Sequence, residues 1–286
     1  MRSLTSRILT VVWSGILALF LTLFIQGIWS ILLVTNLVSS PTIPWAVIVM
    51  ALLLWLIWQY LNGRWWPAST SEARHRYLRA RPIPQEVFIW AFVAGMLSIA
   101  ALTGFWIVLF QLVKIPGNAL PDFSSYPLLP VALVLLMASI VGAVTEEAGF
   151  RGYLQSILER EVGGPAAIVI AALMLSPGHG LTQGFVWPTL MFYFFVDVMF
   201  GVTAYLTKSI LPGIAVHTLG LLIFFTLVWP HDAARRLVSE GGADTWFWIH
   251  VAQVLIFTPL AILAFRRLAQ IVDKAPANQV SWNSVG

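Results

Sequence analysis

The chain has 286 residues, of which 59% are hydrophobic and 10% are charged, and its formal net charge is +4. This composition excludes an ordinary soluble domain and is typical of a polytopic membrane protein. The basic residues are not interleaved with aromatic residues as on a nucleic-acid-binding surface, so we expect no nucleic-acid partner. Cysteine is absent, which excludes disulfides, a thiol nucleophile and a thiolate metal site.

Apolar stretches follow one another along the whole chain, and about eight are long enough to cross the hydrocarbon core of a bilayer. We therefore predict an all-α protein, a polytopic membrane bundle of about eight transmembrane helices forming a single domain, 1–286. The fifth stretch is interrupted by Pro177 and Gly178. The stretches are 8–34, 44–61, 87–113, 127–157, 165–184, 188–206, 210–229 and 246–268.

Basic residues between these stretches predict the orientation. Arg2 and Arg7 precede the first stretch, arginines occupy the loop 62–86, Lys208 follows the sixth stretch, and the tail is basic. The positive-inside rule places these segments and both termini in the cytoplasm. The loop 230–245 also carries arginines and disagrees, but the other loops outweigh it. Tryptophans followed by arginines in 62–86 predict a short helix on the headgroups, with membrane lipids as partners.

Three acidic residues lie inside apolar stretches, and two of them, Glu146 and Glu147, are adjacent. Such groups are costly in lipid and persist mainly where they do chemistry or line a polar path. Glu147 and Arg151 are four residues apart and can pair on one helix face, whereas Glu146 points about 100° away. This division predicts one carboxylate for chemistry and one ion pair; the plainer interpretation is an ion pair that only packs helices. The third acid, Asp197, could line a cavity, partner a histidine, or be a hydrogen-bonded packing residue.

Two histidines lie in later stretches, His179 in the fifth and His217 in the seventh. From the helical rise, Glu146, His179 and His217 all fall at roughly 12–21 Å from the cytoplasmic side. A carboxylate held away from bulk water can take a proton from a bound water molecule near neutral pH. One histidine could orient that water, and the other could stabilise the oxyanion formed on a peptide carbonyl.

The order Glu146-Glu147-x-x-x-Arg151, then His179, then Ser209-x-x-Pro-x-Ile-x-x-His217 resembles the CPBP family of intramembrane proteases. This family includes the type II CAAX prenyl endopeptidases and bacteriocin-processing or immunity relatives, and the resemblance covers about residues 126–229. It implies that Glu146 activates water with His179 as its partner, that Glu147 and Arg151 support the site, and that His217 lies in the oxyanion hole. It also implies a prokaryotic plasma membrane location and a hydrophobic or prenylated peptide or protein as substrate.

Two positions depart from the family pattern. Leu175 stands where the second motif usually has Phe, which is a mild change of packing. Leu221 stands where the third motif usually has Asn or Asp, so an expected amide or carboxyl group is missing. Loss of an oxyanion donor costs about 3–4 kcal/mol where such a donor matters. Thr218 or a backbone group could compensate, the substrate could differ, or the enzyme could be slow or inactive.

A metal-dependent mechanism is the alternative for the same residues. Glu147, His179 and His217 could in principle form a zinc site with two histidines and one carboxylate. The chain has no His-Glu-x-x-His pair, and Arg151 competes for the charge of Glu147. We therefore favour a mechanism without a metal or another cofactor.

These observations predict an intramembrane endopeptidase that hydrolyses a peptide bond in a lipid-modified, CAAX-like or membrane-associated substrate with glutamate- and histidine-activated water. Leu221 keeps open an alternative, a non-catalytic membrane scaffold or bacteriocin-immunity protein that retains the protease fold. A proton-coupled transporter that uses Glu146, Asp197 and the histidines as a relay is a third possibility. The absence of visible inverted repeats weighs against it.

Overall fold

The computed structural model describes residues 4–115, 123 and 126–274, and the described residues form helices and loops without strands. The prediction of an all-α bundle is therefore confirmed; Arg2, counted in the orientation, lies outside the described residues. The elements are α1 (Leu4–Ser39), α2 (Trp45–Leu61), η1 (Ala68–Thr70), α3 (Ser71–Leu78), α4 (Gln85–Leu112), α5 (Leu128–Glu146), η2 (Glu147–Leu154), α6 (Gln155–Val162), α7 (Gly164–Gln183), α8 (Trp187–Thr207), α9 (Leu211–Ile223), η3 (Phe224–Val228), η4 (Trp229–Ala234), α10 (Val238–Gly241) and α11 (Thr245–Lys274).

Six helices of the described part are long and apolar enough to cross a membrane. Helices α2 and α7 are shorter apolar helices, and they correspond to the second and fifth predicted stretches. Helix α7 continues through Pro177, where the sequence predicted an interruption. Neighbouring helices and hydroxyl side chains can compensate for the backbone hydrogen bond that proline removes from a membrane helix. The helices are those of an integral membrane protein, whereas the side on which the termini lie stays a prediction.

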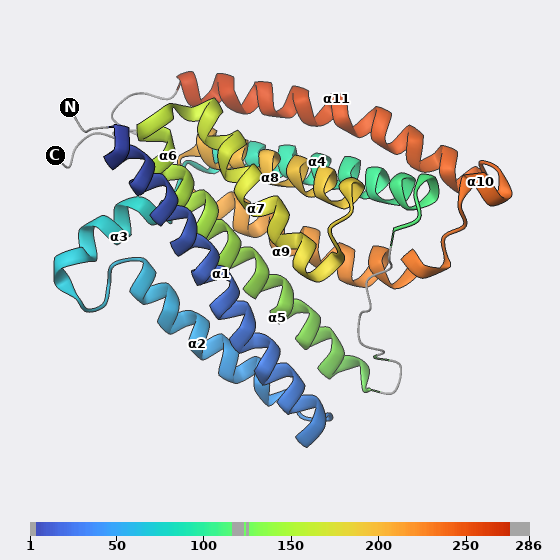
Figure 1. Cartoon of the computed structure of the whole chain (residues 1–286), viewed down its shortest axis with the longest axis horizontal. Helices are drawn as coiled ribbons and strands as arrows, with labels where there is room; N and C mark the ends of the chain where they lie inside the picture. Colours follow the sequence, from blue (N-terminus) through green and yellow to red (C-terminus); the bar gives the residue numbers. More distant parts are fainter. Residues whose placement is uncertain (1–3, 116–122, 124–125, 275–286) are drawn as a thin grey trace.

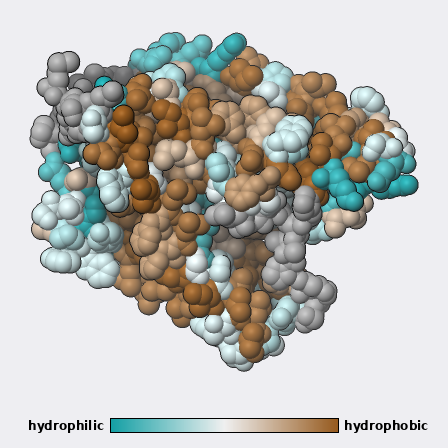
Figure 2. All heavy atoms as spheres, in the orientation of Figure 1, coloured by the Kyte–Doolittle hydropathy of each residue, from teal (hydrophilic) through white to brown (hydrophobic). Residues whose placement is uncertain are grey.

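One end of the bundle gathers the segments predicted to be cytoplasmic. The start of α1, helices α3 and α6, and the end of α11 lie at this end, which we call the terminal end, and α10 lies at the other (Figure 1). Arg79 binds Glu159 there through both guanidinium NH groups, at 2.8 and 2.7 Å. Figure 2 shows apolar residues over most of the visible face and hydrophilic residues gathered near α3 and near α10. This distribution suits a bundle whose middle lies in lipid.

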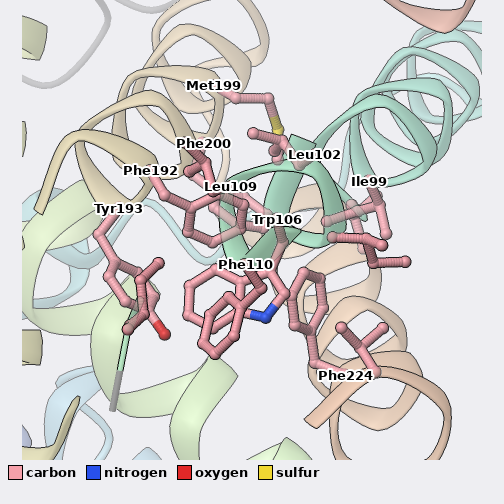
Figure 3. Packing of buried hydrophobic residues seen from close by; sticks show 14 residues of the cluster. Ile99, Leu102, Trp106, Leu109, Phe110, Phe192, Tyr193, Met199, Phe200 and Phe224 are labelled. Atoms are coloured by element: carbon pink, nitrogen blue, oxygen red, sulfur yellow. The ribbon is translucent and has the colours of Figure 1, made fainter. Parts of the chain in front are cut away.

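An aromatic cluster around Trp106 joins the helices that carry the site (Figure 3). The Trp106 ring lies 4.7 Å from Phe192 of α8, 4.9 Å from Phe110 of α4 and 5.9 Å from Phe224 of η3, measured between centroids. Its indole NH donates to Asp232 Oδ2 of η4 at 2.9 Å. Because aromatic pairs at such distances add to the burial term, this cluster fixes α4, α8 and the end of α9 relative to one another.

Candidate functional site

Glu146 of α5, His179 of α7 and His217 of α9 line one cavity of about 410 Å³. The sequence placed them in three different helices at similar depth, and the packing brings them to the same hollow. Helix α1 contributes Gln26, Trp29 and the exposed Ser30, so the cavity reaches the bundle surface beside α1. The other lining residues are mainly apolar: Ile99, Leu102, Ala138, Val141, Gly142, Phe192, Tyr193, Val196, Phe200, Gly220, Leu221, Phe224, Phe225 and Trp229.

The imidazole of His217 lies between the two adjacent glutamates. Its Nδ1 is 3.2 Å from Glu147 Oε1, and its Nε2 is 3.7 Å from Glu146 Oε2. Gln26 Nε2 donates to the other oxygen of Glu146 at 3.2 Å. The 12% exposed side chain of Glu146 thus keeps one oxygen toward the cavity, where His217 faces it without a direct hydrogen bond.

Glu147 is fully buried, and no described residue donates a hydrogen bond to its Oε2. Gly213 of α9 lies against this oxygen: a Cβ atom at residue 213 would stand 2.5 Å from it. The absence of a side chain at Gly213 therefore lets α9 approach the carboxylate closely. Burying a carboxylate oxygen without a hydrogen-bond donor lowers the stability of the fold. Such an oxygen is unusual in a residue whose role is packing alone.

Arg151 has a closer partner than the sequence suggested. Its Nη2 lies 2.6 Å from Asp197 Oδ1 of α8, whereas its Nε lies 3.7 Å from Glu147 Oε1. Residues 147–154 form a π-helix, η2, whose wider turn displaces Arg151 from the regular α-helical position. Asp197 also accepts a hydrogen bond from Ser176 of α7 at 3.0 Å. Asp197 does not line the cavity; it joins η2, α7 and α8 behind it.

One face of α8 supports the ionisable residues of the site. Tyr193, Asp197 and Phe200 are spaced by four and three residues, which places them on a common face. The His179 ring stacks on Tyr193 at 3.8 Å, and the His217 ring stacks on Phe200 at 4.4 Å, measured between centroids. The sequence interpretation missed Tyr193, Phe200 and Gln26. The spacing of the two aromatic residues around Asp197 was the available signal for α8.

Leu221, the main departure from the family pattern, lines the cavity. It packs against α5, because a Cβ atom at Gly142 would lie 2.9 Å from its Cδ1. Thr218 is not among the lining residues, so its hydroxyl does not take the place of the missing polar group. The lining residues that carry polar side-chain groups are instead Gln26, Trp29, Ser30, Glu146, His179, Tyr193, His217 and Trp229.

The residues proposed for a metal site are not arranged around a common point, because His179 stacks on Tyr193 while Glu147 contacts His217. Glu147 Oε1 contacts both His217 and Arg151. Within the described part of the chain, no group of three His, Cys, Asp or Glu side chains is placed to hold a metal ion. The set Glu147, His179 and His217 therefore does not fit zinc as it stands.

The segment that carries this geometry can be compared with known protein families. Residues 128–223 match the family model described as type II CAAX prenyl endopeptidase Rce1-like. This segment of the chain is Rce1-like. This match confirms the resemblance drawn from Glu146, Glu147, Arg151, His179 and His217, all of which fall inside it. The comparisons with curated proteins and with solved structures give no match.

Proposed function

We propose that this protein is an intramembrane endopeptidase that cleaves a hydrophobic or lipid-modified peptide with water activated by Glu146. The observation that carries the proposal is the arrangement of Glu146: one oxygen held by Gln26 and the other facing the cavity and His217 Nε2. The family match to residues 128–223 supports peptidase chemistry at this place. The exposed Ser30 on the cavity lining supports entry of the substrate sideways, beside α1.

In the proposed reaction, Glu146 takes a proton from a water molecule in the cavity as the water oxygen attacks the peptide carbonyl carbon. His179, held against Tyr193, orients this water from the α7 side. His217 is held by Glu147 through Nδ1 and presents Nε2 to the cavity; as an imidazolium balanced by Glu147, it donates to the developing oxyanion. Glu146 then returns the proton to the amine leaving group as the C–N bond breaks.

Glu147, Arg151 and Asp197 act through His217 and the packing of η2 rather than on the substrate. Arg151 lies 5.4 Å from the Phe200 ring centroid and contacts both acids, so it balances two buried negative charges beneath the stacked His217 ring. This arrangement fixes the direction of His217 Nε2, as outer partners do for the ligands of metal sites.

The substitution Glu146→Gln tests the proposal because it keeps the hydrogen bond from Gln26 and removes the base. We expect cleavage of a farnesylated reporter peptide in proteoliposomes to fall by about 10²–10⁴-fold. Glu161→Gln is the matched control, because Glu161 pairs with Arg7 at the terminal end, away from the cavity. Cleavage by the Glu146→Gln protein at the wild-type rate would remove Glu146 from the mechanism.

Leu221 favours a second candidate, a membrane scaffold or immunity protein that keeps the protease fold without cleavage. In that case Glu146→Gln preserves the biological function. Substitutions at the packing glycines abolish it, since a Cβ atom at Gly149 would lie 3.1 Å from the Ala18 carbonyl oxygen and one at Gly152 would lie 2.9 Å from that of Leu78. A protein that never cleaves, but loses function with Gly152→Ala, would establish this candidate.

A further inference from the structure

A second hollow, of about 640 Å³, lies outside the catalytic cavity between α4, α8 and α11. It forms because α11 packs along α4 and touches α8 little, which leaves a channel with α4 as its floor. We call it the α11 groove. It is lined by Ser98, Ala101, Leu102, Phe105, Phe195, Val198, Met199, Val202, Val254, Thr258, Ala261, Ile262, Phe265, Arg266 and Ala269.

The groove is shaped for hydrocarbon. Its depth comes from small buried residues, Ser98 and Ala101 of α4 and Ala261 of α11. Larger apolar side chains, such as Phe195 and Ile262, form the walls and are exposed. The hydroxyl of Ser98 donates to the carbonyl oxygen of Ala94 at 2.8 Å, so this hydroxyl needs no hydrogen-bond acceptor in the groove. The other polar lining residues, Thr258 and Arg266, are exposed. An apolar chain can therefore lie on the floor of the groove without leaving a buried polar group unpaired.

One charged residue, Arg266, lies among the lining residues. It is exposed, and none of the salt bridges between described residues involves it. Its neighbour Arg267 lies over the Trp90 ring, 5.9 Å from the centroid, at the start of α4. Both arginines therefore belong to the terminal end, where Arg79 and Lys208 also lie. A guanidinium at the mouth of an apolar channel suits a phosphate oxygen in particular.

The length of the groove fits one leaflet. Along α11 it extends from Val254 to Ala269, about 22 Å at the helical rise, which is close to the roughly 20–22 Å of one leaflet with its headgroup region. The basic loops predict that the terminal end faces the cytoplasmic leaflet, which carries the anionic lipids. Leu102 lines both hollows and forms part of the wall between them. On either side of this wall, Ser98 and Met199 line the groove, while their neighbours Ile99 and Phe200 line the cavity.

We propose that the α11 groove binds an acyl chain of an anionic phospholipid whose phosphate pairs with Arg266. The apolar channel holds the chain, and the arginine favours a headgroup whose phosphate charge is not neutralised by a cation of the same headgroup. The bound lipid fills the gap between α8 and α11, so it stabilises the position of α8, which carries Tyr193, Asp197 and Phe200. This binding does not depend on the proposed peptidase activity.

Native mass spectrometry of the full protein, released from nanodiscs with equal phosphatidylglycerol and phosphatidylcholine, tests this proposal. We expect wild type to retain phosphatidylglycerol preferentially. The preference should fall roughly fivefold in Arg266→Gln, since one basic residue contributes on this order to anionic lipid binding. Ala261→Phe, which fills the channel floor, should reduce retention of both lipids. Arg236→Gln, at an exposed arginine in the loop 230–245 at the other end of the bundle, is the matched control and should behave as wild type.

Several outcomes would overturn the proposal. Equal lipid preference in wild type and Arg266→Gln would remove the role of the arginine. Displacement of the lipid by a farnesylated peptide would assign the groove to substrate, and displacement by millimolar inorganic phosphate would show a simple anion site. Thermal unfolding in zwitterionic detergent separates binding from folding, because Arg266→Gln should unfold like wild type there and lose only the stabilisation that phosphatidylglycerol adds.

Discussion

Two ion clusters lie on the continuous helix formed by α5, η2 and α6, and they differ in how fully their carboxylates are paired. At the terminal end, Glu159 accepts from Arg79 through both oxygens, from Lys208 at 3.1 Å and from Gln155 at 3.0 Å. About 20 Å along the helix, Glu147 leaves one oxygen without a donor among the described residues. There Glu146 Oε2 lies 3.7 Å from His217 Nε2, beyond hydrogen-bond distance.

This difference is what we expect between a structural cluster and the cluster that we propose to be reactive. A carboxylate whose lone pairs are all occupied by donors has little capacity to bind water or accept its proton. The Glu159 cluster fits that description, and it joins α3, α6 and the α8–α9 turn. Glu146, which lines the cavity, and Glu147 behind it each have a carboxylate oxygen that accepts no hydrogen bond from a described residue. Such oxygens lower the stability of the fold, and a functional site is where this cost is expected. The following substitutions test this distinction, in order of the expected effect on stability.

Asp197→Asn should have the largest effect on stability. It removes the charge closest to the fully buried Arg151, and breaking a buried ion pair costs about 3–5 kcal/mol. Thermal or denaturant unfolding in micelles measures this loss. Asp273→Asn, at an exposed residue near the end of α11, is the control. Equal stability of the Asp197→Asn protein and wild type would show that Glu147 alone balances Arg151.

Glu159→Gln should lower stability by about 2 kcal/mol, because hydrogen bonds to charged groups contribute about 1.5–3 kcal/mol. Cleavage per folded molecule should remain at the wild-type rate, since Glu159 lies away from the cavity. Size-exclusion chromatography gives the folded fraction, and the reporter peptide gives the rate. If the rate fell as far as in Glu146→Gln, the distinction between the two clusters would be lost.

Gly213→Ala should have the smallest effect on stability and a clear effect on activity. The added methyl would stand 2.5 Å from Glu147 Oε2 and push the carboxylate from His217. Such overpacking costs about 1–3 kcal/mol, and we place this case near 1, with a rate reduced roughly tenfold. Gly27→Ala is the matched control, because a Cβ atom at Gly27 of α1 meets nothing within 4 Å. A normal rate in Gly213→Ala would mean that Glu147 does not position His217.

Much of the fold could be predicted from the sequence. Lipid offers no hydrogen bonds to the backbone, so long apolar stretches must become helices, and the eight stretches correspond to helices of the structure. The cost of charge in lipid likewise directed attention to Glu146, Glu147 and Arg151. The interruption predicted at Pro177 failed because the packed bundle tolerates a proline that would end an isolated helix.

Tertiary structure alone decided which polar groups meet. Asp197 pairs with Arg151 because α8 crosses η2 at that level, and Gln26 reaches Glu146 because α1 packs beside α5. Neither contact can be predicted from hydropathy. The spacing of residues along a helix shows on which face a side chain lies, but it does not show which other helix packs against that face. Depth in the bilayer follows from counting residues. The partner across an interface depends on the packing of helices distant in the chain, which composition does not encode.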